Sequence, residues 1–165
     1  MAATVDAAHA RGMIAVVHSR DVEAWADVVE AGVDGIVHLP VEDVPDPVLI
    51  NLLKEQGIWV GGNLSLTRPL GKSLLEDPVI APMLTEPEKE RLRDFAAKHR
   101  DGGDQVALNT VKALHAAGIT FLPGSDSPNG GTTTGATMHR DLEALVDIGF
   151  TPGEALQAAT VDAAA

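Results

Sequence analysis

Cysteine and tyrosine are absent from this chain of 165 residues, and aromatic residues make up only 3% of it. Without cysteine there can be no disulfide, no thiolate nucleophile and no cysteine-based zinc site. A transition-metal site would have to use histidine, aspartate or glutamate. The scarcity of aromatic rings means that the core must be packed from Val, Leu, Ile and Ala. The lack of cysteine fits a cytoplasmic protein, which is our expectation, and is compatible with a periplasmic or secreted one.

Positive charge is also scarce, because 12 Lys and Arg residues stand against 24 Asp and Glu, a formal net charge of -12. Nucleic acids and anionic membrane surfaces attract basic proteins, so neither is expected as a partner. No stretch approaches the roughly 20 apolar residues of a membrane-spanning helix. The apolar fraction of 45% and the charged fraction of 22% are those of a globular protein. The length indicates a single domain over residues 1–165.

One sequence pattern occurs four times: an amphipathic stretch, a glycine and a short apolar run. The copies are AHARGMIAVVH (8–18), VEAGVDGIVH (29–38), KEQGIWVGGN (54–63) and HAAGITFLPGSD (115–126). Each glycine stands where a helix ends in a left-handed cap. Each apolar run is typical of a strand buried on both faces. The alternation of helix and buried strand predicts a parallel α/β sheet.

The pattern predicts strands over 13–17, 34–37, 58–62 and 119–123, and helices over 2–10, 21–31, 45–56, 104–117, 137–148 and 152–163. Residues 64–103 form a long excursion after the third strand, with a helix expected over 87–99. Connections of this length between a strand and a helix are uncommon, so we expect a lid or binding element here.

Four strand–helix units are half of a (β/α)₈ barrel, which needs about 250 residues when complete. The chain opens inside one predicted helix and ends inside another. We therefore expect an α/β fold that is a partial TIM barrel and part of a larger enzyme. A small open α/β sheet that is complete in itself is the alternative.

Polar side chains follow three of the predicted strands. His18 ends the first, His38 ends the second, and Asp126 follows the fourth. The carboxyl ends of parallel strands meet at one edge of the sheet, where ligands bind both in barrels and in open sheets. Two imidazoles and a carboxylate make a plausible set of ligands for a divalent metal. A single histidine after a strand is more often structural, but two at equivalent positions of a repeat favour a metal or catalytic role.

Four segments carry a resemblance that covers nearly the whole chain in one order. They are AHARGMIAVVHS, GVDGIVHL, PGSDSP and MHRDLEALVDIGFTPGEALQAAT, of which the last, with the PGSD before it, is the most specific. The chain resembles the amidohydrolase superfamily, in its imidazolonepropionase-like and prolidase-like branch. The resemblance implies a (β/α)₈ barrel with one or two divalent metal ions, usually zinc. On this basis His18 and His38 match the family's histidines of strands five and six, and Asp126 matches its aspartate of strand eight.

The resemblance implies hydrolysis of an amide-type C–N bond, linear or cyclic, in a small amide or peptide. In this scheme His18 and His38 hold the metal that activates water, and Asp126 moves the proton to the leaving amine. With a single metal ion, His38 would instead polarise the substrate carbonyl. The family's His-x-His pair of strand one and its Lys or Glu of strand four have no counterpart here. The chain is thus expected to lack part of the metal site.

Substrate contacts are expected from Asn63, Arg68, Ser127 and His139. Asn63 and Arg68 stand at the start of the excursion, and an arginine can bind a carboxylate through two parallel hydrogen bonds. Ser127 opens the Gly/Thr-rich loop beside Asp126. His139 stands at the start of a predicted helix and belongs to a His-Arg pair of the family. For Arg68 and His139, simple exposure to solvent is the competing interpretation.

Two other functions remain open. The Gly/Thr-rich loop over 127–135 precedes a helix, and such a loop can bind an anion through its backbone N–H groups. The chain could then be a non-metal α/β domain for an anionic metabolite. Alternatively, it could be an inert half barrel that self-associates through the strand edges at 13–17 and 119–123, because an uncovered edge invites pairing. Such a homo-oligomer is also compatible with the hydrolase.

Overall fold

The computed structural model describes residues 1–64, 73–98 and 105–165. Four parallel strands form one sheet: β1 (Val16–His18), β2 (Gly35–Val37), β3 (Trp59–Gly62) and β4 (Phe121–Pro123). The described helices are α1 (Ala2–His9), α2 (Val22–Glu30), α3 (Pro47–Gln56), α5 (Glu86–Lys98), α6 (Gln105–Ala117), α7 (Ala136–Asp147) and α8 (Pro152–Ala158). Short 3₁₀ turns lie at η1 (Ala81–Met83) and η2 (Asp162–Ala164).

The strands lie in the order in which they occur in the chain, β1-β2-β3-β4, and every neighbouring pair is parallel. This confirms the predicted α/β fold with a parallel sheet. The four glycines of the repeat, Gly12, Gly32, Gly57 and Gly118, have φ between +66° and +74°. An L-residue with a side chain is strained there, so the repeat holds a glycine where each connection turns from a helix toward a strand.

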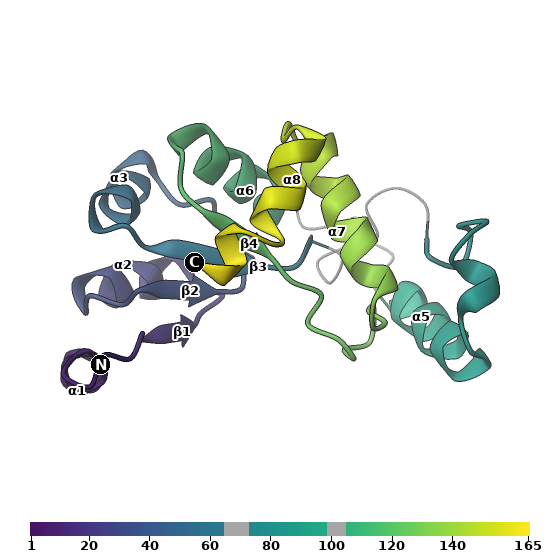
Figure 1. Ribbon diagram of the computed structural model, residues 1–165, viewed down its shortest axis with the longest axis horizontal. Coiled ribbons are helices and arrows are strands. Elements are labelled where there is room, and N and C mark those ends of the chain that lie inside the picture. The colour runs from purple at the N-terminus through teal and green to yellow at the C-terminus, as the bar shows by residue number, and fades with distance from the viewer. Residues whose placement is uncertain (65–72, 99–104) are drawn as a thin grey trace.

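The main core lies on one face of the sheet. Ile36, Val60 and Phe121 occupy one row of the strand register and are almost completely buried. The same cluster contains buried side chains from α2, α3, α6, α7 and α8, among them Val28, Leu53, Val111, Leu145 and Ala155. These helices therefore cover the face to which the row of Ile36 points (Figure 1).

The residues that precede and follow Ile36, Val60 and Phe121 in their strands point to the opposite face of the sheet. Among the described residues, no hydrophobic core forms on that face. Val16 is 41% exposed, while Val37 and Trp59 are partly exposed. The Trp59 indole lies across Gly35, its register partner on β2, where a Cβ atom would come within 2.3 Å of the ring. The prediction that the strands are buried on both faces is thus wrong for the described residues, because the helices gather on one side only.

The excursion after β3 builds a second, smaller core. Leu74, Leu84 and Leu92 are buried together, with Ala136 of α7 packed against them. Arg140 of α7 adds an ion pair to Asp77 at 2.6 Å. Figure 1 places α5, the excursion's helix, beside the start of α7 and away from the sheet. The predicted helix over 87–99 is confirmed as α5.

Two element boundaries differ from the predictions by three residues or more. The sequence predicts the first strand over 13–17, but the strand begins at Val16, because Met13 and Ile14 are exposed and the sheet row starts where Val16 pairs with Gly35. The last helix, predicted to run to 163, ends at Ala158, where the Thr160 hydroxyl donates to the Leu156 carbonyl at 2.6 Å. Such a bond competes with the helical pattern. None of the described helices is long and apolar enough to cross a membrane.

Replacing Gly35 with Ala should destabilise the fold, since its Cβ would meet the Trp59 ring at 2.3 Å. Overpacking of this kind costs about 1–3 kcal/mol of unfolding free energy. Gly124→Ala is the matched control, because nothing lies within 4 Å of its Cβ position. Urea denaturation followed by circular dichroism measures both variants. Equal midpoints for the two would show that the indole does not lie over Gly35 in solution.

Candidate functional site

The two predicted histidines lie side by side at the carboxyl ends of β1 and β2. Their ring centroids are 4.3 Å apart, with an edge-on angle of 63°. Backbone hydrogen bonds extend the sheet past both strand ends, since Ser19 N donates to the Val37 carbonyl and His38 N donates to the Gly61 carbonyl at 2.8 Å. The backbone from which each imidazole extends is therefore fixed by the parallel ladder itself.

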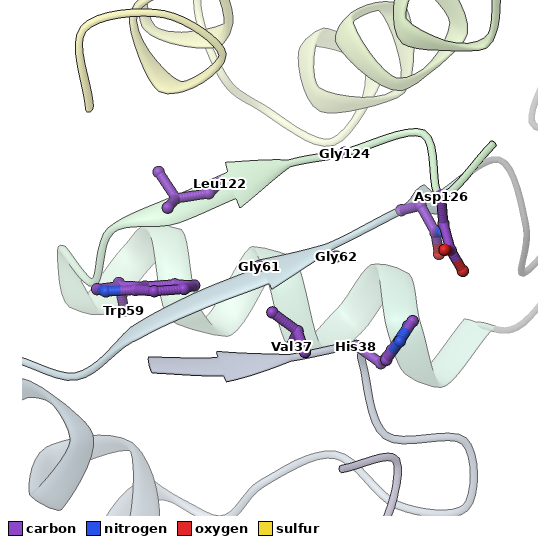
Figure 2. A pocket seen from close by; sticks show the side chains of 9 residues that line it. Val37, His38, Trp59, Gly61, Gly62, Leu122, Gly124 and Asp126 are labelled. Carbon is purple, nitrogen blue, oxygen red and sulfur yellow. The ribbon is translucent and has the colours of Figure 1, made fainter. Parts of the chain in front are cut away.

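Asp126 lies at the same edge of the sheet, beyond β4. Gly124 N donates to the Gly62 carbonyl at 2.9 Å, so the ladder also extends past this strand. Figure 2 shows His38 and Asp126 at the carboxyl-end side of one pocket, with Trp59 at its opposite end. This is the edge at which the sequence placed the candidate residues.

Both His38 and Asp126 have a left-handed backbone, with φ of +76° and +47°. No other non-glycine residue within the described parts of the chain has a positive φ. This conformation is unfavourable for a residue with a side chain, and such strain gathers at functional sites. Backbone strain thus coincides with two of the three residues that the sequence singled out.

The pocket between these residues has a volume of about 380 Å³. It is lined by Val37, His38, Trp59, Gly61, Gly62, Asn63, Leu122, Gly124 and Asp126. Apolar side chains of the uncovered sheet face form its floor, and the polar groups stand at the strand ends. Small-molecule sites commonly combine an apolar lining with a few convergent polar groups.

The surroundings of His38 favour its neutral form. Burial lowers the pKa of His38, the nearby His18 lowers it further, and Arg20 adds to this effect, while Asp126 acts in the opposite direction. A lowered pKa leaves the imidazole uncharged at neutral pH. A neutral imidazole can donate its lone pair to a metal ion, whereas a protonated one cannot.

The histidine pair suits a divalent metal by its chemistry and by its proximity. No three His, Asp or Glu side chains gather closely enough to hold a metal ion in the ranges 1–64, 73–98 and 105–165. The structure therefore brings together His18 and His38, two of the three expected ligands. It places Asp126 on the pocket that His38 also lines. The electrostatic influence of Asp126 on His38 shows that the two groups are near one another.

The four residues expected to contact substrate have different surroundings. Asn63 is 5% exposed and lines the pocket. The Ser127 hydroxyl oxygen is buried and accepts or donates no hydrogen bond within the described structure. His139 is exposed on α7 and is not among the residues that line the pocket. Arg68 lies outside the described residues. The roles of all four stay predictions.

Sequence reasoning missed three residues that support this edge. Asn129 donates from Nδ2 to the Asp126 carboxylate at 2.7 Å. Asp141 of α7 is fully buried and accepts from Leu64 N, next to Asn63, at 3.1 Å. Glu88 of α5 is bonded to the Thr133 hydroxyl in the loop after Asp126. Glu88 left a signal in the Thr-x-x-Glu capping pattern from Thr85. Asn129 stands only three residues after Asp126, whereas the Asp141 contact joins segments 77 residues apart and left no local signal.

Two substitutions should move the pKa of His38 in opposite directions. His18→Ala removes the neighbouring imidazole, whose electrostatic influence lowers the pKa of His38, so the pKa should rise. Asp126→Asn removes a neighbouring anion, so the pKa should fall. Imidazole NMR titration of the metal-free chain measures both shifts. His115→Ala is the control, since His115 stacks on Phe150 at 3.8 Å and lines a different pocket. If neither variant moved the pKa, the three groups would not be neighbours in solution.

Solved structures with the same arrangement of elements come from larger hydrolases. A Xaa-Pro dipeptidase with bound methionine in its active site superposes with a TM-score of 0.68 at 21% identity, over 99% of this chain and 36% of that one. A molinate hydrolase superposes with a TM-score of 0.67 at 17% identity, over 97% of this chain and 34% of that one. A putative prolidase from Bifidobacterium longum superposes with a TM-score of 0.59 at 29% identity, over 99% of this chain and 38% of that one.

The chain thus spans about a third of the length of these structures, with 36% coverage of the dipeptidase. A comparison with curated protein sequences finds no match. The sequence profile of the amidohydrolase family, in contrast, matches residues 1–165. The resemblance noted in the sequence is confirmed, and prolidases are among the structural neighbours. The chain belongs to the amidohydrolase family.

Proposed function

We propose that this chain is part of a metal-dependent hydrolase that cleaves C–N bonds in small amides or peptides. The observation that carries the proposal is the pair of His18 and His38, whose imidazole rings lie 4.3 Å apart at one edge of a parallel sheet, with Asp126 lining the same pocket as His38. Membership of the amidohydrolase family and the similarity to a dipeptidase and a putative prolidase support the reaction class.

The fold proposed for the whole protein is a (β/α)₈ barrel, to which this chain contributes roughly strands five to eight. The support is topological. A doubly wound sheet reverses its strand order and carries helices on both faces. Here the order is sequential, and the main core joins the sheet to α2, α3, α6, α7 and α8 on one side. The uncovered face would be the barrel interior, and residues 64–103 an excursion from this single domain.

His18, His38 and Asp126 would hold the metal ion, which we propose to be zinc, with one or two ions in the complete site. When bound, such an ion acts as a Lewis acid that activates water for attack on a carbonyl carbon. The contribution of this chain is to hold two imidazole nitrogen donors in place. The backbone ladder fixes both histidines, and the lowered pKa of His38 keeps it unprotonated at neutral pH. With a single ion, His38 would instead direct its ring at the substrate carbonyl.

Asp126 is the proposed general base and acid. Its Oδ2 atom accepts a hydrogen bond from Asn129, and no described residue donates to Oδ1. Oδ1 is therefore the atom that would take the proton from water and pass it to the leaving nitrogen. The carboxylate is exposed at the edge of the sheet, so it can reach a substrate that enters from the carboxyl ends of the strands.

Substrate contacts are proposed for the same four residues as before. Asn63 has the strongest support, because it is buried in the wall of the pocket. The buried hydroxyl of Ser127 would gain a partner from a substrate group. Arg68 is the candidate for binding a substrate carboxylate, and His139 is the candidate for a substrate contact from α7.

Anion binding by the loop over 127–135 is the less favoured function. The carboxylate of Glu88 already bonds to the Thr133 hydroxyl there, and neighbouring hydrogen bonds hold the pKa of Glu88 at about 2. Glu88 is therefore ionised at neutral pH. A second anion at this loop would meet a like charge, which opposes its binding.

Zinc titration by isothermal calorimetry tests the metal site on the purified chain. His18→Ala and Asp126→Asn should weaken binding by more than the roughly 10–100-fold caused by loss of a ligand's hydrogen-bond partner. His9→Ala is the control, since His9 pairs with Asp34 at 2.9 Å, away from these residues. Zinc binding that survives both substitutions would refute the site. A folded chain that binds no zinc would refute a metal site formed by this chain alone.

The two outer strands of the sheet are proposed as surfaces for further strand pairing. β1 and β4 each have one strand neighbour among the described elements, and Val16 of β1 is 41% exposed. An eight-stranded barrel places further strands at both edges. Two copies related by a twofold axis along the strands would put β4 of one copy beside β1 of the other, with all strands parallel. The self-association predicted from the sequence is thus retained as a proposal.

Val16→Lys should shift the chain from dimer to monomer, because it places a charge on the face that would become the interior. Val48→Lys on α3 is the matched control, as Val48 is already 67% exposed on the helical side. Sedimentation velocity over a range of concentrations measures both variants. A wild-type chain that stays monomeric throughout would contradict self-association but not the proposed hydrolase.

A further inference from the structure

We propose that Asn129 is a positioning residue for Asp126, and that α5 anchors the loop that carries both. The inference rests on the proposed function, in which Asp126 moves the proton. It gives the excursion after β3 a defined task, which is to brace the catalytic loop. The observation behind it is an unbroken series of hydrogen bonds from α5 to the Asp126 carboxylate.

The first link is between Asn129 and Asp126. The Asn129 side chain donates from Nδ2 to Oδ2 of Asp126 at 2.7 Å and to the Asp126 carbonyl at 3.0 Å. Asn129 N donates to the same carbonyl at 3.2 Å. One amide therefore holds both the side chain and the backbone of Asp126, whose φ of +47° is otherwise unfavourable.

The second link joins Asn129 to the buried threonines of the loop. Thr132 donates from both its backbone N and its hydroxyl to the Asn129 carbonyl, at 2.9 and 3.1 Å. Thr132 and Thr133 are 0% and 1% exposed. Thr133 N donates to the Thr137 hydroxyl at 2.7 Å, which ties the loop to the first turn of α7.

The third link connects these threonines to α5. Arg91 donates from Nη2 to the Thr132 carbonyl at 3.1 Å, and the Thr133 hydroxyl bonds to Glu88. The Phe95 ring lies against Gly131, where a Cβ would come within 2.5 Å of it. Glu88, Arg91 and Phe95 are spaced by three and four residues, so they share one face of the helix. That face meets the loop.

The helix is itself held in place from its other sides. Glu88 also accepts from Thr85 N and the Thr85 hydroxyl, at 2.8 and 2.7 Å, which closes the start of α5. Leu92 packs in the small core of the excursion, against which Ala136 of α7 also packs. The Arg140–Asp77 ion pair adds a second connection to α7. A displacement of α5 would therefore be transmitted through the loop to Asp126.

Amide hydrogen exchange of the purified chain tests the brace without any metal. Asn129→Asp keeps the shape of the side chain but removes the donor, and Glu88→Gln removes the charged acceptor on α5. Each should speed exchange over residues 124–135 by at least about fivefold, as expected from loss of one hydrogen bond. Glu86→Gln is the control on the same helix, since Glu86 pairs only with Lys89 among the described residues.

Unchanged exchange rates over residues 124–135 in both variants would overturn the proposal. An equal increase in exchange rate across the whole chain would also overturn it, because it signals general destabilisation. A rise with Asn129→Asp alone would overturn the part assigned to α5. A local rise with both variants, and none with Glu86→Gln, is the expected result.

Zinc and cobalt(II) binding then test whether the brace acts on Asp126. Asn129→Asp should weaken zinc binding about 10–100-fold, and it should alter the visible spectrum of bound cobalt(II), while Glu86→Gln changes neither. Binding and spectrum equal to wild type would refute the positioning role and leave the proposed function intact. A wild-type chain that binds neither ion would refute the proposed metal site, and the exchange result would then decide on the brace alone.

Discussion

Parallel pairing in sequential order is the constraint on which the rest of the structure depends. Because all four strands run in the same direction, their carboxyl ends lie along one edge, and whatever follows each strand is brought to that edge. Residues 18 and 38 are far apart in the chain, yet the ladder sets their side chains next to each other, and it brings the segment that leads to residue 126 to the same edge. The ladder's hydrogen bonds continue past each strand end, so the site inherits the rigidity of the sheet. Side chains placed on such regular elements are held more exactly than side chains on free loops.

The second constraint is that the sheet is covered on one face only. Ile36, Val60 and Phe121 are buried beneath the helices, whereas Trp59 and Val37 remain partly open on the other side. Gly35 leaves room on that face for the large indole. Alternation of large and small side chains is how the interior of a small barrel is filled. The open face therefore has the alternation expected of the barrel interior that we propose.

Most of the fold could be predicted from the sequence because its signals are local. Each repeat glycine sits at a left-handed position, and the last helix begins with a capping box between Thr151 and Glu154, a pattern of adjacent residues. The histidine pair was also predictable, since it follows from strand order and direction. What could not be predicted depends on distant contacts. Nothing near Asp141 indicates that it will bond to Leu64, 77 residues earlier, or that the helices will cover one face of the sheet only.

The same distinction explains how a site of this kind is assembled. Backbone hydrogen bonds of the sheet hold the two histidines directly. Asp126, in contrast, lies two residues past the last of these bonds, at Gly124. Beyond that bond the backbone has no strand to follow, and its left-handed turn at Asp126 needs support from elsewhere. The loop obtains it from two helices that come from different parts of the chain, α5 through Glu88 and Arg91 and α7 through Thr137. The helix α5, inserted in the chain between β3 and β4, therefore contributes to the proposed site by supporting the loop after the last strand.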